Sequence, residues 1–218
     1  MKTILATLLL GLALALRSHA AFSNLSFEQA TIVPHDGNFG FLDWNLAAPG
    51  WSHSSGADTG IIYYPLTHLG LSQWYLLVAA GTSGHAPLAG NYSLAFSSGY
   101  FTANGPSDFT TAYISQSGVI PFDAQSLRFL ATGPFAVRIN GNLLPVVSLG
   151  GNAYAANISA LAGVPSVLRF ENTTTLIHEE VVVDNIVFSS LPVPEPSAVA
   201  LLTLGGVLVA LRAARRRL

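Results

Sequence analysis

The sequence lacks cysteine altogether, and its 218 residues include a single methionine and a single lysine. Without cysteine the chain can form no disulfide and has no thiolate to act as a nucleophile or metal ligand. Charge is scarce as well, since only 9% of the residues are Asp, Glu, Lys or Arg. The solubility of any folded domain must therefore rest on uncharged polar residues.

Basic residues are rarest in the middle of the chain. Between residues 21 and 191, ten acidic residues stand against three arginines, a net charge of 3 − 10 = −7, and the arginines are Arg128, Arg138 and Arg169. A surface of this sign repels phosphate backbones, which excludes nucleic acid as a partner. The same surface can attract cations, calcium among them.

The first 20 residues have the order of a secretory signal peptide. Lys2 precedes an apolar run from Ile4 to Leu16, and Ser18 and Ala20 are the small residues of a cleavage site after Ala20. A permanent N-terminal anchor is the alternative, but the run is short and a good cleavage site follows it. We therefore expect export by the Sec translocon and removal of residues 1–20 by signal peptidase.

The C-terminal 26 residues combine three features in sequence. Val193, Pro194, Glu195, Pro196 and Ser197 form an extended, accessible motif, because proline neither continues a helix nor fills an inner strand. Residues 198–211 carry no charge and suit lipid, and a basic tail at 212–218 would stop translocation through its arginines, which are Arg212, Arg215, Arg216 and Arg217. The apolar run reaches only roughly 21 Å at about 1.5 Å per residue, short of the ~30 Å hydrocarbon layer, which suits a segment held briefly and then cut. The alternatives for this apolar segment are an ordinary C-terminal membrane anchor and a buried helix of a soluble domain.

This motif, apolar run and arginine cluster resemble the PEP-CTERM sorting signal of Gram-negative bacteria. The resemblance implies a transmembrane sorting helix and an exosortase-type transpeptidase as processing partner. It also implies passage through the inner membrane and a final place on the cell surface or in the extracellular polysaccharide matrix. The expected organisation is a signal peptide at 1–20, an ectodomain at 21–191 and a sorting signal at 192–218.

The ectodomain reads as about ten short strands separated by Gly, Pro, Asn and Ser clusters, which predicts an all-β sandwich. Asn140-Gly141 is a strong hairpin signal, because both residues tolerate positive φ. Residues 34–90 are less strand-like and are expected to form loops at one end. The predicted strands are Asn24–Ala30, Gly60–Tyr64, Trp74–Ala79, Tyr92–Ser97, Ala112–Ile120, Ser126–Ala131, Phe135–Ile139, Leu143–Ser148, Ala153–Ile158, Ser166–Asn172 and Glu180–Ser189.

Four segments resemble galactose-binding-like jelly rolls, a family that includes many carbohydrate-binding modules. They are residues 24–28 (NLSFE), 49–51 (PGW), 112–121 (AYISQSGVIP) and 181–188 (VVVDNIVF), and they follow the expected order. The resemblance implies a single jelly-roll β-sandwich as the fold of the ectodomain.

Glu28 and Asp184 are candidate calcium ligands. Each sits in an otherwise apolar segment, and first and last strands of jelly rolls often lie side by side, which would bring the two carboxylates together. Neighbouring carboxylates repel unless a cation or a proton lies between them, and calcium takes oxygen ligands, with Asp36 or Asn185 as possible additions. Related carbohydrate-binding modules carry a structural calcium there. The alternative is two solvated edge-strand acids, or one acid that caps a turn.

Trp44, Trp74 and Tyr64 are candidate glycan-binding residues. Sugar rings stack on exposed aromatic planes, and nearby polar side chains read their hydroxyls. The alternative is that most of these rings fill the core, as we expect for Trp51.

No catalytic motif is recognisable in the sequence, which has neither a Gly-x-Ser-x-Gly elbow nor histidines at metal-ligand spacing. We therefore expect a non-catalytic exported protein that is structural or associated with extracellular polysaccharide. A calcium-stabilised carbohydrate-binding module is the alternative, and a polysaccharide-active enzyme on the same scaffold is the distant one.

Overall fold

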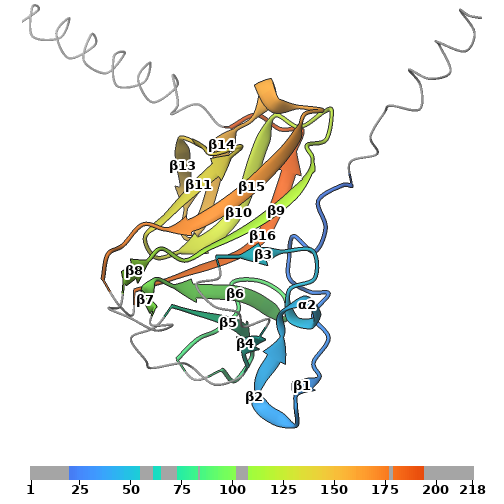
Figure 1. The fold of residues 1–218 in the computed structure, drawn as a ribbon. Helices are drawn as coiled ribbons and strands as arrows, with labels where there is room; N and C mark the ends of the chain where they lie inside the picture. Colours follow the sequence, from blue (N-terminus) through green and yellow to red (C-terminus); the bar gives the residue numbers. More distant parts are fainter. Residues whose placement is uncertain are drawn as a thin grey trace, which may run out of the picture.

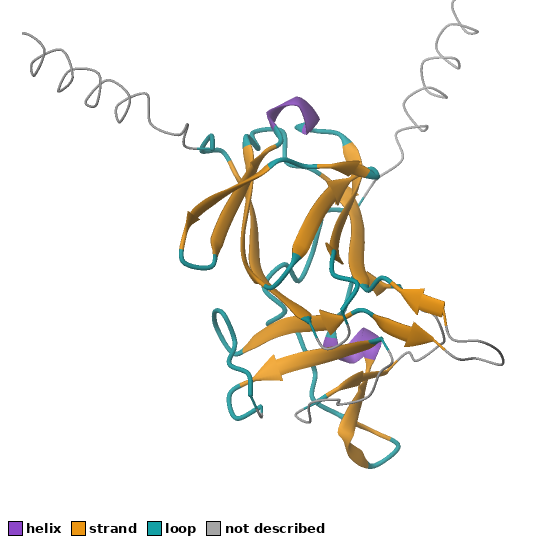
Figure 2. Ribbon diagram, turned by 90° about the vertical axis from the view of Figure 1, so that its left-hand side faces the viewer, coloured by secondary structure: helices purple, strands orange, loops and turns teal. Residues whose placement is uncertain are grey.

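A computed structural model describes residues 20–54, 61–64, 73–82, 84–101, 108–176 and 179–193. Within them the chain is almost entirely β-strand, with one short helix, α2 (Trp44–Ala47), and one 3-10 turn, η1 (Ser159–Leu161). Two main sheets share one buried core, so the architecture is a β-sandwich. Figures 1 and 2 show the strands of the two sheets facing each other in the upper part of the molecule. The all-β prediction is confirmed.

The larger of the two main sheets contains nine strands among the described residues. In spatial order they are β1 (Pro34–His35), β2 (Asn38–Asp43), β4 (Ile61–Tyr63), β5 (Trp74–Ala79), β6 (Tyr92–Ser97), β16 (Glu180–Ser189), β10 (Ser126–Thr132), β14 (Ala153–Asn157) and β13 (Val146–Gly150). Neighbours are antiparallel except β4 and β5, which are parallel with Tyr63 opposite Leu76.

The smaller main sheet contains five strands within the described residues. Their order is β12 (Asn142–Leu143), β11 (Phe135–Ile139), β15 (Pro165–Asn172), β9 (Tyr113–Val119) and β3 (Ser52–His53). A separate hairpin pairs β7 (Gly99–Phe101) with β8 (Asp108–Thr110).

The core follows from the alternation of side chains along the strands. On the five-stranded sheet, residues such as Ile114, Leu168 and Phe170 are fully buried and point inward, while their neighbours along each strand lie on the outer face. Strand β5 departs from this pattern, because all six of its residues are buried. Its second face belongs to a smaller cluster of Trp74, Leu76, Val78, Ala95 and Val182.

Most predicted strands are found close to their predicted bounds, and the predicted hairpin at Asn140-Gly141 is confirmed. These two residues have φ of 52° and 81°, and β11 pairs with β12 across them. The expected strand 143–148 is instead divided, since its first residue pairs in the five-stranded sheet and β13 joins the other sheet.

The prediction of a strand at 24–30 is wrong. This segment consists of turns, with φ of 47° at Asn24 and 58° at Phe27, so it cannot form a regular ladder. It still lies beside the last strand, where the Ile186 N–H donates to the Leu25 carbonyl at 2.9 Å. The expectation of loops from 34 to 90 is also wrong in part, because β1, β2, β3 and α2 lie there in addition to the two strands predicted in this range.

Both ends of the described chain lie at the connection between β9 and β10. Ala21 bridges Val119, and the Ser126 hydroxyl donates to the Leu191 carbonyl at 2.6 Å. The two core clusters found among the described residues extend from the opening segment to the last strand, β16. No helix within the described residues is long and apolar enough to cross a membrane, and residues 194–218 lie outside them.

Candidate functional site

The outer face of the five-stranded sheet carries a row of side chains in register. Arg138 on β11 is paired with Arg169 on β15, Arg169 with Ser115 on β9, and Ser115 with Ser52 on β3. The two arginines and Ser115 are half-buried and Ser52 is exposed, because the other side of each strand packs in the core. Four neighbouring strands thus present one polar row to solvent.

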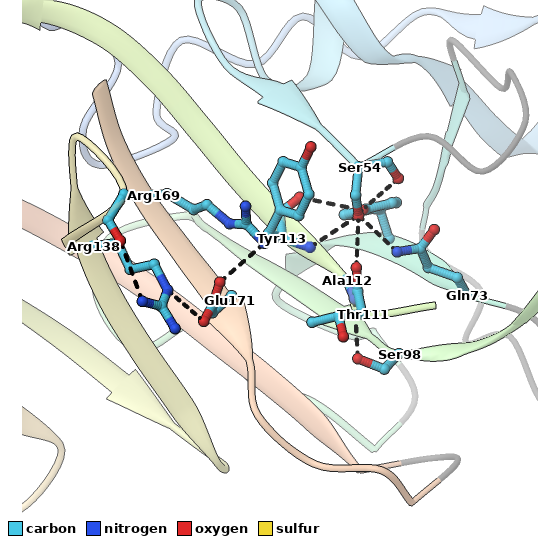
Figure 3. A network of polar contacts seen from close by, with 11 residues as sticks. Ser54, Gln73, Ser98, Thr111, Ala112, Tyr113, Arg138, Arg169 and Glu171 are labelled. Atoms are coloured by element: carbon cyan, nitrogen blue, oxygen red, sulfur yellow. Dashed lines mark hydrogen bonds and ion pairs between the residues drawn. The ribbon is translucent and has the colours of Figure 1, made fainter. Parts of the chain in front are cut away.

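Glu171 joins the two arginines on this face, and Tyr113 packs against one of them (Figure 3). The Arg138 Nε donates to Glu171 Oε1 at 2.8 Å, and the Arg169 Nη2 lies 2.9 Å from Glu171 Oε2. The Arg169 guanidinium also lies over the Tyr113 ring, 3.6 Å from its centroid. We call Tyr113, Arg138, Arg169 and Glu171 the arginine cluster.

Register explains why these four side chains meet. Residues two apart on one strand lie on the same face, which puts Glu171 beside Arg169. Arg138 is paired with Arg169, so it is a diagonal neighbour of Glu171. Tyr113 is paired with Glu171, so it is a diagonal neighbour of Arg169. Diagonal neighbours on a sheet are within reach of long and aromatic side chains.

A hydrogen-bonded network around Ser54 fixes the backbone next to the cluster. The Ser54 Oγ accepts from the Tyr113 N–H at 3.0 Å and from Gln73 Nε2 at 2.7 Å, and it lies 2.7 Å from the Tyr75 hydroxyl. Burial raises the pKa of Tyr75 well above its usual range, so this hydroxyl stays protonated and donates to the Ser54 and Tyr113 carbonyls. Figure 3 shows this network and the arginine cluster meeting at Tyr113.

The predicted aromatic candidates are not on this face. Trp44 is 3% exposed and donates from Nε1 to the Trp51 carbonyl at 2.6 Å, and Trp74 is 4% exposed in the smaller cluster. Neither indole offers a face to solvent, so their burial does not support the predicted sugar-stacking role and we correct it: both rings fill the core. Trp51 is buried as expected. Tyr64 is half-buried against the main core, and its role in glycan binding stays a prediction.

The two candidate calcium ligands meet at one segment, residues 89–93. The Glu28 carboxylate accepts from the N–H groups of Asn91 and Tyr92 and from Asn91 Nδ2, at 2.7, 3.0 and 2.9 Å. Asp184 Oδ2 accepts from the Ala89 N–H at 2.9 Å and the Ser93 hydroxyl at 2.7 Å. The carboxylates therefore approach the same turn from the opening segment and the last strand.

Their surroundings act differently on the two acids. Partial desolvation acts to raise the pKa of Glu28, but its hydrogen bonds from Tyr92 and Asn91 outweigh this and lower that pKa. Asp184 is fully buried, and burial raises its pKa even though Ser93, Asn185 and Ala89 donate to it. The negative charge of Glu28 adds to the rise.

One contact between a histidine and a carboxylate was not predicted from the sequence. His85 Nδ1 lies 3.1 Å from Oε1 of Glu180, the first residue of β16. Burial raises the pKa of Glu180, and the nearby His85 acts against that rise. The remaining predicted site residues, Pro194, Glu195, Pro196 and the four tail arginines, lie outside the described residues.

Sequence reasoning missed the arginine cluster, although one signal was present. Arg138 and Arg169 each occupy a slot between apolar neighbours in a predicted strand, which places each on the outer face. The two arginines meet only because β11 pairs with β15, which brings together residues 31 positions apart. The residue pattern within one strand does not indicate which other strand it pairs with.

No protein-family model matches this chain, and no curated protein does either. Among solved structures, the chain is similar to the enzymatically active domain of tailspike protein 4 from bacteriophage CBA120, at 16% identity and a TM-score of 0.39. That alignment covers 77% of this chain and only 21% of the tailspike chain, so this chain spans about a fifth of its length. A second similar structure is CBM27-1 of Caldicellulosiruptor saccharolyticus, solved with mannohexaose, at 13% identity and a TM-score of 0.34, covering 75% of this chain and 100% of the other.

Proposed function

We propose that this chain is an exported, non-catalytic protein of the cell surface or extracellular matrix, whose ectodomain holds polysaccharide on the outer face of the five-stranded sheet. The proposal includes Sec export, processing by an exosortase near Pro194–Pro196, and a jelly roll of the galactose-binding-like kind. Support for export comes from the two terminal segments and their order. An enzyme on the same scaffold is the distant alternative.

The single observation that carries the binding role is the polar row across β11, β15, β9 and β3. Its side chains are in register across four strands and carry guanidinium and hydroxyl groups, and the half-buried Tyr113 ring lies beside the row against Arg169. A polysaccharide is an extended chain of hydroxyls and apolar C–H faces, and such groups bind through hydrogen bonds and ring contacts. The fixed backbone beside Ser54 keeps this surface in place before any ligand arrives.

A glycan array tests this role. Protein recovered from the cell surface, shown by mass spectrometry to end near Pro194–Pro196, should bind a subset of extracellular polysaccharides. Ser115→Ile should weaken that binding by about fivefold, since a hydrogen bond is worth about 1 kcal/mol and the new side chain adds bulk in the row. The matched control is Ser148→Ile on β13, at an exposed position of the other sheet. Equal binding by both variants would place the glycan elsewhere, and release of reducing ends would favour the enzyme.

Calcium remains part of the proposal as a structural ion at Glu28 and Asp184. The donor chemistry fits, because both are carboxylates and calcium prefers oxygen ligands. Among the described residues no three His, Cys, Asp or Glu side chains cluster, so backbone carbonyls would complete the shell. Each carboxylate already accepts three hydrogen bonds, and an ion would have to displace some of them.

Calcium should therefore raise the melting temperature by about 5 °C or more at saturation, because a ligand that binds only the folded state stabilises it. Glu28→Gln should abolish this rise, whereas Asp123→Asn, at an exposed position in the connection between β9 and β10, should keep it. The measurement is a thermal scan with calcium and with EGTA. Identical scans in both would remove calcium from the proposal and leave the polar row untouched.

A further inference from the structure

We infer that the arginine cluster binds an anionic sugar, through an oxyanion that is either a uronate carboxylate or a sulfate ester. This inference rests on the proposed function and names its class of ligand. It is carried by three features of the cluster: an uncompensated positive charge, guanidinium groups with free donors at the surface, and a geometry that is fixed in advance.

The charge comes from two like charges placed side by side. Arg138 and Arg169 are directly opposite each other on adjacent strands, an arrangement that costs stability unless an anion compensates. Glu171 lies between them and is 8% exposed, so it neutralises one of the two charges. A charge of about one unit remains on a domain whose net charge is −7. Binding of one further anion would balance the cluster.

The arginines still have donors to offer. A guanidinium has five N–H groups, and Arg138 donates from Nε to Glu171 and from Nη1 to the Gly141 carbonyl at 3.2 Å. Arg169 contacts Glu171 through Nη2, and its Nε is buried with no hydrogen-bond partner within the described residues, so its outer Nη groups are the donors that a ligand would meet. Both side chains are about one third exposed, at 34% and 33%, so a ligand in solvent can reach their outer edges.

The cluster is also held in place before binding. The Tyr113 ring lies against one plane of the Arg169 guanidinium, and Glu171 holds one edge of each arginine. Fixed planar guanidinium groups match the geometry of carboxylate and sulfate, and little side-chain freedom is lost when they bind. The net negative charge of the whole domain disfavours general adsorption of acidic polymers, so binding of an anionic chain requires a local positive charge such as that of this cluster.

The test compares sugars that differ only in charge. Isothermal titration of the protein recovered from the cell surface would use tetragalacturonate, its methyl ester and a sulfated tetrasaccharide of neutral sugars. We expect the free acid to bind at least about tenfold more tightly than the ester, since charge-assisted hydrogen bonds are roughly twice as strong as neutral ones. The sulfated sugar decides whether the oxyanion is specifically a carboxylate.

Arg138→Gln and Arg169→Gln should each weaken binding of the free acid by roughly tenfold. Each single variant leaves one arginine paired with Glu171, so folding is retained, and melting temperatures check this. The control Arg128→Gln makes the same change on β10 in the other sheet, where Arg128 donates to Ser126 Oγ and the Pro192 carbonyl, and should bind as the unaltered protein does.

The outcomes separate this inference from the proposed function. If acid and ester bind equally, or if all three arginine variants bind alike, the anionic ligand is rejected while glycan binding on the sheet stands. If a panel of neutral and anionic sugars gives no binding at all, both proposals fail. The comparison of acid with ester needs no variant, so it decides the question even if a substitution disturbs the fold.

Discussion

Replacing Gly133 with alanine should destabilise the protein by about 3 kcal/mol or more, because two separate costs coincide at this turn. Gly133 lies between β10 and β11 with φ of 82°, a conformation that residues with a Cβ rarely adopt. A Cβ built there would also overlap the carbonyl oxygen of Glu180, the first residue of β16. The overlap involves backbone on both sides, so no side-chain rotation can relieve it, and β10 and β16 must shift where they pair.

Gly141→Ala is the matched control for this result. Gly141 has nearly the same φ, 81°, but a Cβ there would meet nothing within 4 Å. It should cost only about 1 kcal/mol, the price of the backbone conformation alone. Urea unfolding of the two variants measures the difference directly. If both variants lose the same free energy of unfolding, the backbone around Glu180 moves away from the new Cβ at no cost, and the pairing of β10 with β16 is not rigid.

The sequence contains most of the strands because local alternation determines them. In β9, apolar Ile114 alternates with Tyr113 and Ser115, and the observed strand differs from the predicted one by a single residue at each end. The hairpin at Asn140-Gly141 was equally predictable, since only residues that tolerate positive φ suit both central positions. These features depend on neighbours in the chain and need no knowledge of the tertiary fold.

The candidate site depended on tertiary contacts and could be predicted only in part. Trp44, in an expected loop, and Trp74, at the start of a predicted strand, were candidates for exposed rings, but burial of an indole depends on which elements pack over it, and both lie in the core. Glu28 and Asp184 each bond to residues 89–93, although the segment with Glu28 forms turns and not the predicted strand, and their role as calcium ligands stays a prediction. The segment 89–93 that contacts both was not identified from the sequence, because most of its contacts come from backbone N–H groups, which every segment has.

Asp184→Ala should destabilise the protein by about 3 kcal/mol, the second large effect that the structure predicts. The Asp184 carboxylate is fully buried and accepts from the Ala89 N–H, the Ser93 hydroxyl and the Asn185 N–H. Ser93 extends this hydrogen-bond network, since its Oγ also accepts from the Leu88 N–H at 2.8 Å. Alanine would leave these donors without their acceptor beneath β16. Thermal and urea unfolding of the variant, with Asp123→Asn as an exposed control, measure the loss.

Asp184→Asn separates the shape of this side chain from its charge. It should lower the free energy of unfolding by about 1 kcal/mol at neutral pH, less than the alanine variant. The amide fills the same space, but its NH₂ group would face one of the groups that donate to Asp184. Burial raises the pKa of Asp184 above its ordinary value of 3.8. Between that value and the raised pKa, the folded protein therefore binds more protons than the unfolded chain. The stability that Asp184 contributes is thus complete below 3.8 and decreases as pH rises through the raised pKa. The asparagine variant lacks this decrease, and the advantage of the native protein over it should therefore shrink from about pH 3 toward neutrality. An advantage that grows over the same range would mean that the donors from Ser93, Asn185 and Ala89 outweigh burial and that the folded carboxylate prefers to be ionised.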